Sequence, residues 1–159
     1  MPTVAVLKDS ARPRHWPAYT MAVLFLAYAA GKAVFALQAR LGFPGGPPVS
    51  AAETERYARE LMAPATAQWL AVASGVAGAC LALATVTSLG RRVPRALALL
   101  VLAAMFLAVA GGAGIMIVDG FVGVGIGWRW YHGVLGLVVI GLQAATIRSY
   151  AMATRRNGN

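Results

Sequence analysis

Residues 96–118 read ALALLVLAAMFLAVAGGAGIMIV, and this stretch decides the fold. It contains no charged side chain and no strongly polar one. As a helix, a run of this length crosses a hydrocarbon core about 30 Å thick. Arg95 precedes it and Asp119 follows it, so charges stand at both ends of the apolar run. The stretch therefore predicts a transmembrane helix.

The composition of the whole chain supports a membrane protein. Hydrophobic residues make up 59% of the 159 residues and charged residues only 12%. A soluble domain carries roughly a quarter charged residues. This chain therefore lacks the polar side chains to cover its own core in water, and it needs an apolar solvent outside as well as an apolar interior.

Three more apolar runs have the length of a membrane span. They cover residues 18–39, 65–89 and 131–150, and the first contains a single charge, Lys32. We therefore predict an all-α bundle of four transmembrane helices, forming one membrane domain over residues 18–152.

The loop between the first two spans contains a short helix. Its first part, residues 42–48, reads GFPGGPP and is incompatible with regular structure. Ser50 and Glu53 then have the spacing of a capping box, and the residues that follow are good helix formers. We expect this helix to end before Pro64 or to kink there.

Basic residues predict the orientation. Nine of them fall in the N-terminal tail, between spans two and three, or at the C-terminal end, which puts all nine on one side: Lys8, Arg12, Arg14, Arg91, Arg92, Arg95, Arg148, Arg155 and Arg156. The positive-inside rule then places both termini, with tails at residues 1–17 and 153–159, in the cytoplasm. We expect a multi-pass protein of the plasma membrane, with the 42–63 loop and its helix outside the cytoplasm.

Two other interpretations fit parts of this pattern less well. The first span also resembles a signal peptide with a cleavage site near residues 27–29, but its apolar run continues to Leu37. The net charge of +9 would suit nucleic-acid binding, but the basic residues sit in small groups between apolar runs. We expect the first span to be retained and nucleic acid not to be a partner.

Polar residues of all four spans converge near the outer side. A lysine inside a span is costly, so Lys32 either snorkels to the headgroups or faces the bundle with a partner, for which Asp119 is the natural candidate. His132 is the side chain best suited to proton transfer. We predict an outward-facing polar pocket with the 42–63 loop as its lid. Its candidate residues are Lys32, Asp119, His132, Gln68, Arg129 and Tyr131.

Small residues four apart predict how the helices pack. Lipid tails are as apolar as leucine, so close approach of backbones drives helix pairing in a membrane. Span two offers Gly75/Ala79 and Gly78/Ala82, and span three offers Ala104/Ala108. Span four adds Gly133 and Gly136.

The dipeptide Gly31-Lys32, late in the first of four short spans, resembles the DoxX-like small membrane proteins. The resemblance implies a four-helix membrane protein, and some members of that family are linked to quinone chemistry or redox stress. The proline-glycine loop and the charged helix after it depart from that pattern.

The residues favour a non-enzymatic accessory subunit. There is no Ser-His-Asp, HExxH, CxxC or P-loop pattern, so we expect no catalytic set, no metal and no cofactor. The expected partners are the lipid bilayer and either a membrane protein or further copies of the chain. A lipid- or quinone-linked redox enzyme using the outer pocket is the first alternative, and an oligomeric transporter is the second.

Overall fold

A computed structural model describes residues 15–155 of the chain. Residues 1–14 and 156–159, on which most of the predicted basic tails fall, lie outside the described residues. The helices in chain order are α1 (Trp16–Leu37), α2 (Ala51–Glu60), α3 (Pro64–Ala84), α4 (Ser88–Arg92), α5 (Arg95–Val122) and α6 (Trp130–Arg155).

Four of the helices are long and apolar enough to cross a membrane, namely α1, α3, α5 and α6. The short helix α2 lies between the first two of them. The predicted all-α fold with four candidate spans, and a short helix between spans one and two, is thereby confirmed.

Proline and glycine set several helix ends. Pro64 is the first residue of α3, where its missing N–H would have no partner in any case. The helix ends at Ala84 rather than at Leu89, and the basic connector contains the separate short helix α4. At the other end of the bundle, α5 closes on Gly123, whose φ of 75° is left-handed and whose N–H donates to Asp119 O at 2.8 Å.

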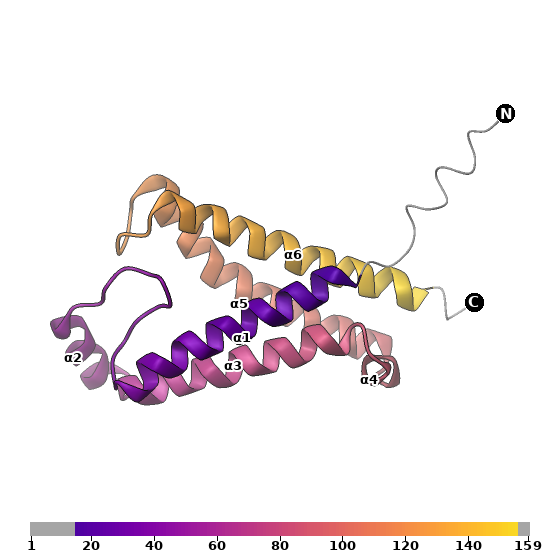
Figure 1. The fold of residues 1–159 in the computed structure, drawn as a ribbon, viewed down its shortest axis with the longest axis horizontal. Helices are drawn as coiled ribbons and strands as arrows, with labels where there is room; N and C mark the ends of the chain where they lie inside the picture. The colour runs from indigo at the N-terminus through magenta and orange to yellow at the C-terminus, as the bar shows by residue number, and fades with distance from the viewer. Residues whose placement is uncertain (1–14, 156–159) are drawn as a thin grey trace.

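The spans pack as two antiparallel pairs, α1 with α3 and α5 with α6. Contact between α1 and α6 joins the pairs, as Figure 1 shows. The loop from α1 to α2 and the connection from α5 to α6 lie at the same end of the bundle, which we call the loop end. The candidate site lies there.

Glycines on α3 and α6 allow these helices to approach their neighbours, as the small-residue spacing predicts. A Cβ on Gly78 would stand 2.8 Å from the Phe25 ring, and one on Gly136 would stand 2.9 Å from Ala113 O. At either distance a Cβ would force the neighbouring group to shift, so the close approach of the helices depends on glycine.

The helix α2 begins with the predicted capping box. Ser50 Oγ accepts from Glu53 N–H at 3.2 Å, while Glu53 Oε2 accepts from Ser50 N–H at 3.1 Å and from Ser50 Oγ at 2.8 Å. Two exposed ion pairs join residues four apart on α2, Arg56–Glu60 and Glu55–Arg59, each at 3.8 Å.

The capping box makes α2 sensitive to acid. Hydrogen bonds from the side chain and then the backbone of Ser50, with help from Arg56, hold the pKa of Glu53 below its ordinary 4.5. Since the charged form is favoured in the folded helix, the stabilisation is complete above pH 4.5 and is lost as the pH falls through the lowered pKa. We expect backbone amides of residues 51–60 to exchange faster with deuterium below pH 4, after correction for intrinsic rates.

A matched variant separates this effect from general acid unfolding. In Glu53→Gln the side-chain oxygen still accepts the Ser50 hydrogen bonds but no longer titrates. We expect its α2 amides to show no additional acid sensitivity. Equal acid-induced loss of protection in the wild type and in Glu53→Gln would contradict the assignment.

Candidate functional site

The centre of the candidate site is the loop segment Gly42–Gly46, which we call the plug. It turns tightly, with Pro44 and Gly45 at the central positions and Gly46 N–H donating to Phe43 O at 2.9 Å. Gly45 has a φ of 69°, which suits the third position of a type II turn. The GFPGG sequence therefore forms a defined turn at the loop end of the bundle (Figure 1).

Lys32 and Gln68 hold the plug through one carbonyl. Lys32 Nζ donates to Gly42 O at 2.7 Å, and Gln68 Nε2 donates to the same oxygen at 3.2 Å. The two side chains come from α1 and α3, the paired helices, and both are buried. The two side chains thus hold the Gly42 carbonyl where α1 and α3 pack together.

Lys32 neither snorkels nor pairs with an acid. Only 5% of the residue is exposed, and its ammonium lies 4.1 Å from the centre of the Phe43 ring and 5.6 Å from that of Tyr28. Within residues 15–155 no carboxylate lies within 4.0 Å of it. Its hydrogen-bond partner is a neutral backbone oxygen.

Asp119 orders the connection between α5 and α6. Its Oδ2 accepts from Gly127 N–H and from Trp128 N–H, both at 3.0 Å, and the residue is buried. A Cβ on Gly125 would stand 2.7 Å from the same oxygen, so the connection wraps closely around the carboxylate. Asp119 thus acts on backbone amides and not on Lys32.

His132 fastens the plug to α6. Its Nδ1 accepts from Arg129 N–H at 3.1 Å, so the ring proton must be on Nε2, which donates to Gly45 O at 2.9 Å. We infer this tautomer from the hydrogen bonds. The neutral imidazole satisfies both contacts, and α6 is tied to a loop that starts on α1.

Trp128 fills the space between the plug and α6. Its ring packs edge-on against Phe43, with centres 5.4 Å apart, and against His132, with centres 4.8 Å apart. A Cβ on Gly46 would stand 2.7 Å from the Trp128 ring. Lys32, Phe43, Trp128 and His132 therefore form a continuous series of contacts from α1 to α6.

The structure brings together some of the predicted site residues and leaves others aside. Lys32, Gln68 and His132 contact the plug, and Asp119, near the C-terminal end of α5, accepts a hydrogen bond from the Trp128 backbone. Arg129 contributes its backbone N–H while its side chain is exposed, and Tyr131 lies against the His132 ring with centres 4.2 Å apart.

Sequence reasoning missed Phe43 and Trp128 as members of the site. The available signal was Phe43, an aromatic residue inside the proline-glycine turn. The glycines beside it have no side chain and leave room for a neighbouring ring. Such a pattern indicates that a turn packs against something, but it does not say against what.

Two buried polar atoms near the plug have no hydrogen-bond partner within the described chain, Gln68 Oε1 and Trp128 Nε1. Buried polar groups are normally satisfied, so each such atom indicates something missing or exchangeable at that position. The plug therefore satisfies the bundle's polar groups incompletely.

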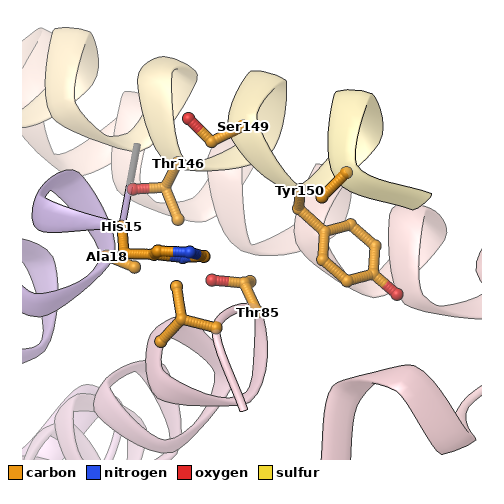
Figure 2. Close-up of a pocket in the computed structure, with 8 residues that line it drawn as sticks. His15, Ala18, Thr85, Thr146, Ser149 and Tyr150 are labelled. Carbon is orange, nitrogen blue, oxygen red and sulfur yellow. The ribbon is translucent and has the colours of Figure 1, made fainter. Parts of the chain in front are cut away.

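Other hollows lie away from the plug. A cleft of about 320 Å³ separates α2 from the α5–α6 connection and is lined by Leu41, Arg56, Tyr57, Leu61 and Ile126, among others. At the opposite end, Figure 2 shows His15, Thr85, Thr146 and Tyr150 around a cavity of about 10 Å³, room for about one water. No group of three metal-ligating side chains occurs among residues 15–155.

Comparisons with known proteins find no family model, no curated protein and no solved structure that matches this chain. The fold itself defines the class, a small multi-pass membrane protein with four candidate spans.

Proposed function

We propose that this protein is a non-enzymatic accessory subunit that binds a membrane partner through one face of α5. The observation that carries the proposal is the unequal burial of the four spans. Only 11% of the most apolar part of α5 is buried within the chain, against 22–28% for the other three spans. The most apolar helix is thus the one that its own bundle covers least.

Small residues distinguish this face of α5 from ordinary lipid-facing surface. Cβ atoms on Gly111 and Gly112 would meet nothing within 4 Å, whereas those on the packed glycines of α3 and α6 would clash. Glycine inside a helix costs about 1 kcal/mol relative to alanine, so its use on an open face calls for a reason. Close approach of a partner helix supplies one.

The exposed face continues along the helix. Ala104 and Ala108 are exposed and four residues apart, and Gly112 is four residues further on. This spacing places small residues on one side of the helix, where they permit another helix to approach closely. Bulky neighbours, Leu107 and Ile115, flank them and are also exposed.

The polar residues at the loop end support an accessory role. Lys32, Asp119 and His132 each hold backbone groups of the plug or of the α5–α6 connection. The dipeptide Gly31-Lys32, which carries the DoxX-like resemblance, also holds the plug. Gly31 leaves room for Pro44, and Lys32 donates a hydrogen bond to Gly42 O. We propose that a fixed loop end, outside the cytoplasm, and an open α5 face together present the subunit to its partner.

In-cell photocrosslinking tests the interface. A photoreactive amino acid at Ala108 should give a discrete protein adduct in native membranes, and Gly112→Leu should reduce its yield about tenfold because the larger side chain separates the helices. The matched control is the same amino acid at Leu26, which is exposed near the middle of α1, as Ala108 is near the middle of α5. The mass of the adduct shows whether the partner is a second copy of the chain or another protein.

The interface proposal fails if positions 108 and 26 give the same pattern, or if Gly112→Leu leaves the yield at Ala108 unchanged. Either result would show that the small-residue face of α5 is not a specific interface.

A further inference from the structure

We propose that the Lys32 site binds the anionic head of a single-chain lipid, in exchange for the plug carbonyl. Carboxylate and monophosphate heads are the two sources of this chemistry. The proposal is independent of the α5 interface, and it starts from a buried cation whose charge nothing in residues 15–155 neutralises within 4.0 Å.

The first argument is the mismatch between Lys32 and its present partner. An ammonium has three N–H donors and a full charge, and here it donates to one neutral carbonyl, Gly42 O. Lysines within membrane spans are costly and pair with opposite charges or with backbone carbonyls, and of these an opposite charge is the stronger partner. An anionic oxygen at the position of Gly42 O would form a shorter, stronger, charge-assisted hydrogen bond.

The second argument is that Gln68 converges on the same point. Its Nε2 lies 3.2 Å from Gly42 O, so two donors from two helices already aim at one oxygen position. A carboxylate or phosphate head offers several acceptor sites and can serve both donors at once. Gln68 is only 3% exposed, so its Nε2 donates at a position largely shielded from water.

The third argument is the route from the cation to the bilayer. The rings of Phe43 and Tyr28 lie against the Lys32 ammonium and are themselves 40% and 37% exposed. They form an apolar path from the buried head-group position to the surface of a membrane-spanning helix. An acyl chain following these rings would enter the hydrocarbon while its head stays at Lys32.

The fourth argument is that the plug can be exchanged. Its side-chain hydrogen bonds to the bundle are those of Lys32 and Gln68 to Gly42 O, and that of His132 to Gly45 O. An anion that takes over the first two leaves the third in place. The loop would then remain tethered to α6 through Gly45 while the Gly42 carbonyl moves away from Lys32.

Direct ligand binding tests the proposal. The protein is placed in nanodiscs of phosphatidylcholine, whose heads have no net charge, and titrated with radiolabelled oleate in a proximity assay. We expect saturable binding that weakens about tenfold or more in Lys32→Met, and about threefold to tenfold in Gln68→Leu. The matched control is Arg59→Met, which removes an exposed cation on α2 at the same end and should change affinity less than about twofold.

Competition experiments with wild-type protein keep the test valid even if Lys32→Met does not fold. Oleyl alcohol, which has the same chain and no charge, should not displace oleate. Oleyl phosphate should displace it, and the stronger of the two anions identifies the natural source. The proposal is overturned if oleate shows no saturable binding, if oleyl alcohol competes equally, or if folded Lys32→Met and Gln68→Leu bind oleate like the wild type.

Discussion

Asp119→Ala should lower the free energy of unfolding by about 2–4 kcal/mol and release the connection between α5 and α6. The carboxylate accepts two backbone hydrogen bonds at 3.0 Å, and a hydrogen bond to a charged group contributes about 1.5–3 kcal/mol. Alanine would leave the buried Trp128 N–H without its partner. Because Trp128 packs on Phe43 and His132, the effect should extend to the plug.

The control for this prediction keeps an oxygen in place. In Asp119→Asn the side-chain carbonyl can still accept from one or both amides, without the charge, so we expect less than half the loss. Thermal unfolding in detergent gives the stability, and hydrogen exchange at Gly127 and Trp128 gives the local effect. Similar losses in the two variants, or unchanged protection of the Trp128 amide in Asp119→Ala, would contradict the role assigned to the carboxylate.

The spans could be predicted from sequence because their signal, the length of an uninterrupted apolar run, does not depend on contacts with other parts of the chain. A run such as residues 96–118 must be a helix in lipid, since only a helix satisfies its backbone there without a partner strand. The end of α3 was harder to predict, because residues 85–89 are apolar enough to continue a span. In the structure the chain leaves the helix at Thr85 and begins a new one at Ser88.

The polar side chains of the candidate site stand out in the sequence, whereas its aromatic members and its contacts do not. A lysine in a span, an acid at the end of another and a lone histidine are conspicuous against an apolar background. Their partners are backbone groups, Gly42 O, Gly45 O and Trp128 N–H, and backbone groups are the same at every position of a sequence. The positions of Lys32 and Asp119 along their spans therefore suggested that the two form a pair. In the structure Lys32 binds the loop after α1, and Asp119 binds the connection after α5.

The unsatisfied side-chain oxygen of Gln68 also follows from binding to a backbone partner. A loop carbonyl can accept from both Lys32 and Gln68, but it has no N–H to offer Gln68 Oε1 in return. Within the loop that was predicted to be a lid, residues 42–46 thus satisfy donors of the bundle better than acceptors. This asymmetry could not be read from the sequence, because it depends on which face of the turn meets the bundle.

Gly31→Ala should expel the plug while leaving the four spans folded. A Cβ at this position would stand 2.5 Å from Pro44 Cβ, and the proline ring cannot rotate away from it. Overpacking of this kind costs about 1–3 kcal/mol, which corresponds to about a fivefold to hundredfold rise in the open population of the loop. Hydrogen exchange of residues 42–46 should rise by that factor, with α1 itself protected as before.

A double variant makes the test specific to this contact. Pro44→Gly removes the ring that the new methyl group meets, so Gly31→Ala should cost much less in that background, and the difference gives the coupling between the two residues. Gly141→Ala, where a Cβ meets nothing within 4 Å, controls for the general effect of alanine in a helix and should be neutral or slightly stabilising. If Gly31→Ala costs the same with and without Pro44, then the strain lies elsewhere and Gly31 does not seat the plug. If the coupling is present, the glycine before Lys32 has a definite physical role: it lets the loop come close enough for the lysine to reach Gly42 O.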